Sequence, residues 1–360
     1  MKKTLPILVL LTLFLMVEYE VMAQARSRSR AMRAQSKRIS NYRGGVAGGF
    51  GKKAFTTLGF SINALNYFGD LAPKSSAAST DISFTRPGFG LFLEHKVAAR
   101  AWVRGSFIYG RLQGSDFKSA SPDDESARFR YVRTLQFRND IFEFSAQGVI
   151  DITPNYSTFL GRPTFTPYIF GGVAVLYHNP KGLVPETDIN TGQPLEDAGK
   201  WVALEPLGTE GQYTDGSGVS TYSKIQIAIP VGIGLRYMIN QSFDVSVEVG
   251  YRHLFFDHID DVGGNYVDLG TLDSDLARAM SDRSRELVDV ESGEARDLTN
   301  PLVAEIVNKR DANNLISGYG SAGNGANIRG NSADNDIYVV TSIKVSYILG
   351  SSIFGKAKYR

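Results

Sequence analysis

Hydrophobic and polar residues alternate strictly along several stretches of this chain. Residues 243–252 read FDVSVEVGYR, with an apolar residue at every odd position and a polar, charged or small residue between. This period of two is that of a pleated strand, not of a helix. The stretch Gln226–Tyr237 repeats the pattern, and only Met238–Ser242 separates the two. The sequence therefore predicts an antiparallel hairpin here.

The same pattern recurs often enough to predict an all-β protein of eight strands. The predicted strands are Leu58–Phe68, Gly88–Val97, Trp102–Leu112, Phe142–Ile152, Tyr168–Tyr177, Gln226–Tyr237, Phe243–Phe255 and Ile337–Leu349. Pro230 lies in the middle of the sixth strand, where it removes a ladder hydrogen bond, so we expect a bulge there. The segment Phe129–Arg138 could extend the fourth strand upstream.

Alternation alone does not say which face of a barrel is apolar. A lipocalin-like soluble barrel turns its apolar face inward, and a membrane barrel turns it outward. Small and charged residues share the face opposite the apolar row, as Arg104, Glu143 and Glu248 do. Burying such charges in a soluble core costs several kcal/mol each unless they are paired, whereas a narrow polar lumen can pair them. The soluble barrel stays an alternative.

The lengths of the connections favour the membrane barrel. Long connections and short turns alternate, as in outer-membrane barrels, which have long external loops and short periplasmic turns. With a periplasmic amino terminus, the outer connections are Gly69–Pro87, Gln113–Arg133, His178–Tyr222 and Phe256–Asp336, and the inner ones are Ala98–Ala101, Thr153–Pro167 and Met238–Ser242. We predict an eight-stranded antiparallel transmembrane β-barrel with long extracellular loops and a polar interior filled by side chains.

The remaining regions indicate export. Met1-Lys2-Lys3, an apolar run to Val17 and Ala23 before Gln24 are typical of a cleaved secretory signal over residues 1–23. The chain contains no cysteine, which excludes disulfides, thiolate metal sites and lipidation of cysteine. We divide the rest into a basic flexible periplasmic arm (24–53), the barrel (54–349) and a basic periplasmic tail (350–360).

Charge is distributed unevenly over these regions. Residues 24–53 contain nine bases and no acid, whereas the predicted last outer loop (257–336) contains sixteen acids and seven bases. Within that loop, Asn300-Pro301 followed by Leu302, Val303, Ile306 and Val307 predicts a short helix, and a second is expected over Asp275–Val288. We expect these helices to plug or cap the barrel.

Two motifs lie where predicted strands reach the outer rim. The first strand ends in Asn66-Tyr67-Phe68-Gly69-Asp70-Leu71. The seventh contains Tyr251-Arg252-His253 and leads into Asp257-His258-Ile259-Asp260-Asp261-Val262-Gly263-Gly264-Asn265-Tyr266. These motifs resemble the PorG-like outer-membrane barrels of the type IX secretion system. The family pattern has Tyr where this chain has His258, and Ser where it has Gly263.

The resemblance covers the barrel, roughly Phe55–Leu349, and implies a function. It implies an eight-stranded outer-membrane barrel that contacts the periplasmic lipoprotein ring of the secretion apparatus and other outer-membrane subunits, with no enzymatic activity and no cofactor. The rim-motif residues it marks are Asn66, Tyr67, Gly69, Asp70, Tyr251, Arg252, His253, Asp257, Asp260, Asp261, Gly264 and Tyr266.

Catalytic and metal-binding alternatives rest on few residues. His178 and His258 are expected at the outer rim, but no nucleophile motif accompanies them. Asp257, Asp260, Asp261 and Asn265 could offer oxygens to Ca²⁺, although their spacing is not that of a known calcium loop. The alternative is that these carboxylates accept backbone N–H bonds in a tight turn. Neither the catalytic nor the metal site is part of our prediction.

The basic arm is a candidate contact for a periplasmic partner. Its exported context and its lack of regular aromatic residues argue against nucleic acid. An acidic partner or the lipid surface could engage Arg26, Arg28, Arg30, Arg33, Lys37, Arg38 and Arg43, and a merely solvated tail is the alternative. For the whole barrel, the alternative function is a small-solute channel or ligand-binding barrel.

Overall fold

The computed structural model of the chain describes residues 54–71, 84–124, 127–188, 191–308, 328–331 and 335–350. The predicted signal sequence, the basic arm with its seven candidate contact residues and residues 351–360 of the tail lie outside the described residues.

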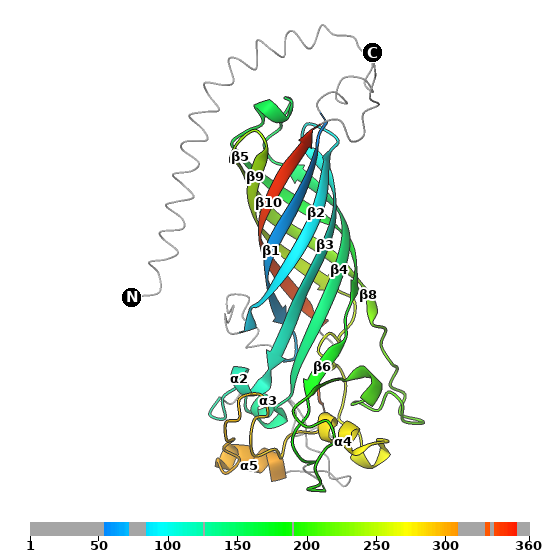
Figure 1. Cartoon of the computed structure of the whole chain (residues 1–360). Coiled ribbons are helices and arrows are strands. Elements are labelled where there is room, and N and C mark those ends of the chain that lie inside the picture. Colours follow the sequence, from blue (N-terminus) through cyan, green and yellow to red (C-terminus); the bar gives the residue numbers. More distant parts are fainter. Residues whose placement is uncertain are drawn as a thin grey trace, which may run out of the picture. The chain divides into compact units, whose positions relative to one another are not determined.

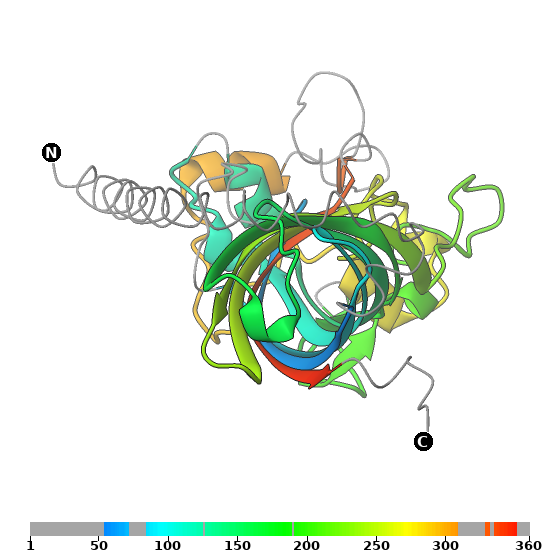
Figure 2. The same ribbon diagram turned by 90° about the horizontal axis from the view of Figure 1, so that it is seen from above.

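Eight long antiparallel strands form a closed barrel (Figures 1 and 2). The hydrogen-bonded order is β3-β2-β1-β10-β9-β8-β5-β4, and pairing between β3 and β4 closes the ring. These strands are β1 (Thr56–Phe68), β2 (Arg86–Lys96), β3 (Ala101–Ser115), β4 (Gln136–Asp151), β5 (Phe165–Tyr177), β8 (Ile225–Met238), β9 (Phe243–Leu254) and β10 (Ile337–Gly350). The predicted eight-stranded barrel is confirmed.

Two short strands were not predicted. β6 (Pro180–Leu183) pairs with the start of β4 and with β7 (Trp201–Ala203), which extends the sheet beyond the barrel at one end. We call this the loop end, because the long connections lie there. The opposite, short-turn end carries the turns 97–100, 152–164 and 239–242.

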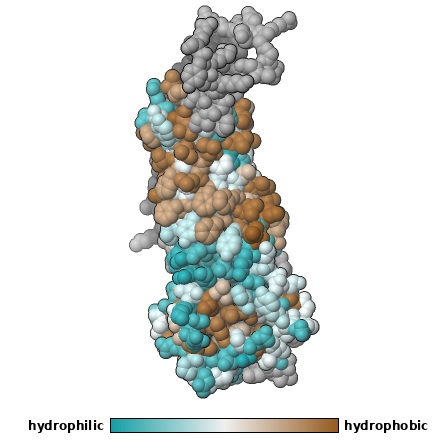
Figure 3. All heavy atoms as spheres, turned by 45° about the vertical axis from the view of Figure 1, so that its right-hand side comes forward, coloured by the Kyte–Doolittle hydropathy of each residue, from teal (hydrophilic) through white to brown (hydrophobic). Residues whose placement is uncertain are grey.

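The alternating sequence pattern corresponds to alternating burial, with the apolar side chains outside. Along β9, Phe243, Val247 and Val249 are exposed, whereas Asp244, Glu248 and Arg252 are buried. Brown hydrophobic side chains cover the barrel wall and teal hydrophilic ones gather at the loop end (Figure 3). An exterior this apolar requires lipid as its solvent, so the soluble alternative is wrong.

Aromatic side chains mark both edges of this apolar belt. At the short-turn end Phe165 contacts Tyr237 and Phe243 contacts Tyr347. At the loop end Phe142 contacts both Tyr109 and Tyr177. Phe165 and Tyr177 lie on one strand roughly 40 Å apart along its length, or roughly 30 Å once a typical tilt is allowed for. This spacing matches the thickness of a bilayer's hydrocarbon core.

The barrel corrects two details of the predicted strands. No bulge forms at Pro230: the β8–β9 register is continuous, and the β5–β8 register is the same on either side of an unpaired stretch, Gly171 pairing with Val231 and Ala174 with Ala228. The ladder accommodates the missing N–H by an interruption instead. Strand four does not begin at Phe129, because α3 (Arg128–Arg133) occupies that segment and β4 starts at Gln136.

The helices are short and lie at the loop end. Besides α3 they are α2 (Asp116–Ser119), α4 (Asp275–Ser281) and α5 (Pro301–Asn308), with 3-10 turns η3 (Glu205–Leu207) and η4 (Leu269–Thr271); η2 (Phe159–Gly161) lies at the short-turn end. α5 begins at Pro301 as predicted, but α4 stops well before Val288. No helix of the described residues is long and apolar enough to cross a membrane.

Candidate functional site: a plugged barrel mouth

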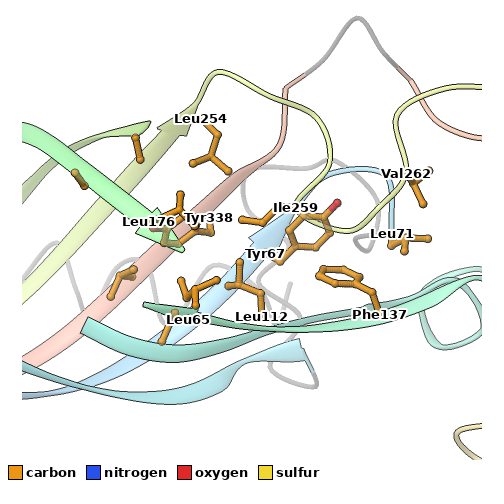
Figure 4. Packing of buried hydrophobic residues seen from close by; sticks show 14 of the residues in the cluster. Leu65, Tyr67, Leu71, Leu112, Phe137, Leu176, Leu254, Ile259, Val262 and Tyr338 are labelled. Carbon is orange, nitrogen blue, oxygen red and sulfur yellow. The ribbon is translucent and has the colours of Figure 1, made fainter. Parts of the chain in front are cut away.

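The segment 257–264, which follows β9, folds into the barrel mouth at the loop end; we call it the plug segment. Its Ile259 and Val262 are fully buried against residues of the barrel wall and against Leu71, which follows β1 (Figure 4). Figure 4 shows Ile259 beside Tyr67 and Val262 beside Leu71. The predicted helices were expected to plug or cap the barrel; an irregular segment carrying a rim motif forms the plug instead, while α4 and α5 lie at the loop end.

Carboxylates hold the backbone of the plug segment. Asp260 Oδ1 accepts the N–H of Val262 at 2.9 Å, and Asp336 Oδ2 accepts the N–H of Ile259 at 2.9 Å. The hydroxyl of Tyr67 lies 2.6 Å from Asp260 Oδ2 and 2.8 Å from Asp336 Oδ1. The expected role of Asp260 in a backbone turn is confirmed, and Asp336 adds a partner that the motif did not contain.

Burial perturbs these acids. It raises the pKa of Asp260 and of Asp336 well above the ordinary value, and the negative charges of neighbouring acids raise both further. Burial also raises the pKa of Asp70, although the charge of Arg133 opposes the shift. The surroundings of these three acids therefore disfavour ionisation.

Gly69 is required by the close packing at this point. A Cβ atom there would lie 1.9 Å from Asp336 Oδ1 and 2.1 Å from the Tyr67 hydroxyl. Both distances are far below van der Waals contact. The glycine of the first rim motif thus lets β1 pass directly beside the acid pair.

Two buried arginines link the loops around the plug segment, and one of them, Arg329, bonds the segment itself. Arg133 donates to both carboxylate oxygens of Asp116, at 2.7 and 2.9 Å, and to the carbonyl oxygen of Asp70. Arg329 donates to Glu210 and to the carbonyl oxygens of Asp261 and Ser281. Burial alone would raise the pKa of Glu210, but His258 and Arg329 lower it to about 2.

Asp261 has a strained backbone that its contacts maintain. Its φ of 68° lies in the left-handed region, which a residue other than glycine seldom adopts. The side chain accepts hydrogen bonds from Thr209 and Tyr222, each at 2.6 Å. Burial raises its pKa to about 6, against the opposing charge of Arg329. Among the described residues, no group of three or more acids or histidines is arranged to hold a metal.

Below the plug, ion pairs fill the lumen. Arg104 contacts Glu94 and Glu248, each at 2.6 Å, and Lys344 contacts Glu248 at 2.6 Å. Arg236 joins Glu94 to Asp151. A second set nearer the loop end pairs Arg252 with Glu143, which also accepts a hydrogen bond from Tyr338. These contacts confirm the predicted polar, filled interior.

The short-turn end is closed as well. Arg162 in the turn 152–164 donates to Asp244 and to the carbonyl oxygens of Asn240 and Gln241. Lys96 donates to the carbonyl oxygen of Asn155, and Phe159 packs edge-on against Phe55. This turn therefore lies pinned across the second mouth.

The structure brings together most, but not all, of the rim-motif residues. Tyr67, Gly69, Asp70, Asp257, Asp260, Asp261 and Gly264 lie in or beside the plugged mouth. Asn66 instead bonds Thr85, and Tyr266 packs with Tyr131 and Val303 in a separate loop cluster.

The Tyr251-Arg252-His253 motif is split by strand alternation. Arg252 points into the lumen, whereas Tyr251 stacks on His253 outside, and Phe255 meets that histidine edge-on. The motif therefore contributes one charge to the interior and two rings to the aromatic edge of the belt.

The two rim histidines lie in an aromatic stack. His178 stacks between Tyr222 and Phe256, and Tyr222 also stacks on His258. The His178 Nε2 atom lies 3.1 Å from the carbonyl oxygen of Ser223, and burial lowers the pKa of His178 to about 4. The contacts of His178 are those of a neutral packing residue.

Sequence reasoning missed five residues that position the plug: Asp116, Arg133, Glu210, Arg329 and Asp336. Asp336 directly precedes a predicted strand, which was the one available signal. Asp116 and Arg133 lie on the short helices α2 and α3, and Glu210 and Arg329 lie on irregular loops. Their partners are distant in sequence, so no local pattern pointed to them.

Comparisons with known proteins found one family model and several solved structures. Residues 50–194 match the model of a domain of unknown function (DUF6089). No curated protein is similar enough to count as a relative. Similar solved structures include Neisserial surface protein A (8% identity, TM-score 0.34, 82% of this chain and 97% of that one). Outer membrane protein OprG of Pseudomonas aeruginosa is also similar (9% identity, TM-score 0.32, 83% and 96%).

Identities and TM-scores this low carry no functional argument. The closed pairing of eight strands, the apolar belt and its two aromatic edges define the molecule by themselves. The chain is an eight-stranded β-barrel of the outer-membrane type.

Proposed function

We propose that this chain is a non-enzymatic component of the type IX secretion system, whose outer-membrane barrel anchors or docks the periplasmic lipoprotein ring. The observation that carries the proposal is the closed lumen: ion pairs fill it, the plug segment closes one mouth and the turn 152–164 closes the other. A barrel of this kind offers partners its surfaces and gives solutes no path.

The arrangement of the rim motifs supports the proposal. Sequence segments that resemble the PorG-like barrels, around Tyr67 and around Asp260, are far apart in the chain but join in one buried cluster. A resemblance carried by residues that bond one another is more specific than one carried by unrelated surface positions.

The proposal assigns each end of the barrel a compartment. The short turns and the basic arm, with Arg26, Arg28, Arg30, Arg33, Lys37, Arg38 and Arg43, face the periplasm and the ring. The loop end, with its excess of acids, faces outward, toward other outer-membrane subunits or exported cargo.

Co-purification from outer membranes tests the proposal. The tagged full chain is expected to recover the ring lipoproteins. Deleting residues 24–53 should reduce that recovery, and a matched variant with the seven arm bases replaced by glutamine separates charge from length. Undiminished recovery with both variants would remove the arm from the account, and absence of ring lipoproteins with the full chain would refute the docking role.

A small-solute channel is the competing function. It requires a continuous water path, which the Arg104 ion pairs and the two closed mouths block. Stable single-channel currents through the purified chain in planar bilayers would favour this alternative.

A further inference from the structure

The hydroxyl of Tyr67 carries a single hydrogen, but it lies within hydrogen-bond distance of two carboxyl oxygens, one from Asp260 and one from Asp336. We propose that Tyr67, Asp260 and Asp336 form a proton-sharing latch, which holds the plug segment in the barrel mouth and releases it when alkaline pH removes the shared proton. The inference concerns control of the mouth and does not depend on the secretion role.

Counting hydrogens at the latch motivates the proposal. The Tyr67 hydroxyl has one hydrogen, yet its oxygen lies within 2.8 Å of a carboxylate oxygen of each acid. The other oxygens of the two acids already accept from Val262 and Ile259. If both carboxyls were ionised, one of them would face the lone pairs of the phenol with no hydrogen between. A proton on one carboxyl completes both short contacts.

The surroundings of the latch favour that additional proton. The three side chains are at most 3% exposed, so ionisation is poorly solvated. Among the described residues, the other titratable groups that act on the pKa of Asp260 and Asp336 include Asp70 and Asp257, which are also acids. The nearby cations have acid partners of their own, since Arg133 pairs with Asp116 and Arg329 with Glu210. His258 lies next to Glu210, at 3.8 Å.

The location of the latch couples the proton to the plug. Asp260 belongs to the plug segment, Tyr67 to β1, and Asp336 directly precedes β10. A second negative charge would therefore push the plug segment away from the first and last strands of the barrel. It would also strain the bonds from Ile259 and Val262, the two residues that insert apolar side chains into the mouth.

The direction of the pH effect follows from the raised pKa values. The closed mouth binds the proton more tightly than an open one, so the latch is stable through acidic pH and is lost as pH rises through the raised value. Each unit of pKa difference changes the closed-to-open ratio about tenfold. Asp261, whose pKa is raised to about 6, acts in the same direction as pH rises toward that value, whereas Glu210 acts oppositely, as pH falls from its ordinary pKa toward about 2.

Infrared spectroscopy of the wild-type chain in bilayers tests the proton directly. We expect the carbonyl band of a buried protonated carboxyl at neutral pH. It should disappear on alkaline titration and should be altered in Asp260→Asn and Asp336→Asn. A neutral-pH spectrum without such a band, or with one unchanged in both variants, would overturn the proposal.

Thiol labelling tests the coupling to the plug, and the chain has no native cysteine to interfere. Val262→Cys is labelled with a polar maleimide in the wild-type background and with Asp260→Asn, whose amide supplies a fixed hydrogen toward Tyr67. The ratio of the two rates cancels the intrinsic pH dependence of the thiol. We expect the labelling rate in the wild-type background, divided by the rate with Asp260→Asn, to be near one below neutral pH and to rise tenfold or more at alkaline pH. A constant ratio would overturn the proposal, and Tyr67→Phe provides a second background if Asp260→Asn does not fold.

Discussion

At Gly69 the barrel mouth has no room for a methyl group, because the carboxylate of Asp336 and the hydroxyl of Tyr67 occupy the position of a Cβ atom. The sequence marked this glycine through a family motif but gave no physical reason for it. That reason depends on Asp336, which is distant in sequence and outside the motif. Residue-scale roles in the mouth were thus predictable only where a local pattern existed.

Gly69→Ala is expected to destabilise the fold by about 2 kcal/mol or more, because overpacking forces buried groups apart. The matched control is Gly105→Ala on the lipid-facing wall, where no atom lies within 4 Å of the added carbon. That change should stay within about 0.5 kcal/mol. Urea unfolding in lipid vesicles measures both variants, and equal stabilities would contradict the close packing described for the mouth.

Arg104→Met is expected to cost about 3–5 kcal/mol, since it removes the buried charge that pairs with both Glu94 and Glu248 and leaves these two acids only Arg236 and Lys344. Arg111 provides the control, because its pair with Asp140 is partly exposed. Arg111→Met should cost less than about 1 kcal/mol. The same unfolding assay compares the two, and a small effect of Arg104→Met would mean that water enters the lumen.

At the scale of elements, strands were predictable and loops were not. Each strand has one lipid-facing and one lumen-facing side, so the solvent imposes a strict period of two that can be read from sequence. β6, which begins at Pro180, and β7 are only four and three residues long, which is too short for an alternation of apolar and polar residues to be recognised. The loop elements depend on long-range contacts, as when Arg296 donates to the carbonyl oxygens of Tyr131 and Val132 of α3.

Those contacts of Arg296 lead to a prediction for the loop end. The arginine also bonds the carbonyl oxygen of Glu286, so it joins α3 to the segment that follows α4. Arg296→Met should speed amide exchange in residues 283–298 by about tenfold or more, the equivalent of about 1.4 kcal/mol. Lys200→Met, which removes an exposed pair with Asp197, should leave exchange there unchanged. Similar exchange in the two variants would contradict a joining role for Arg296.

At the scale of the whole molecule, the same chain presents an apolar wall to lipid and fills its lumen with charged side chains. Within the part of the chain that the structure describes, the charges of the polar interior are paired across the barrel, and the plug segment and the turn 152–164 lie at its two ends. Closure by the plug segment was not predictable from sequence, since Tyr67 and Asp336 are separated by 269 positions. The distinction between lumen-facing and lipid-facing residues was predictable, because polar and apolar residues alternate along each strand.

The most direct test of the account is the solvent of the barrel wall. Single cysteines replace Phe144, Val173 or Ile233 on the wall and Leu287 at the loop end; all four side chains are well exposed. In reconstituted vesicles, fluorophores at the three wall positions should be quenched by lipid-borne nitroxide and protected from aqueous iodide, and the probe at position 287 should show the reverse. Iodide quenching at the wall positions, without quenching by the lipid-borne nitroxide, would contradict the membrane barrel and every proposal that rests on it.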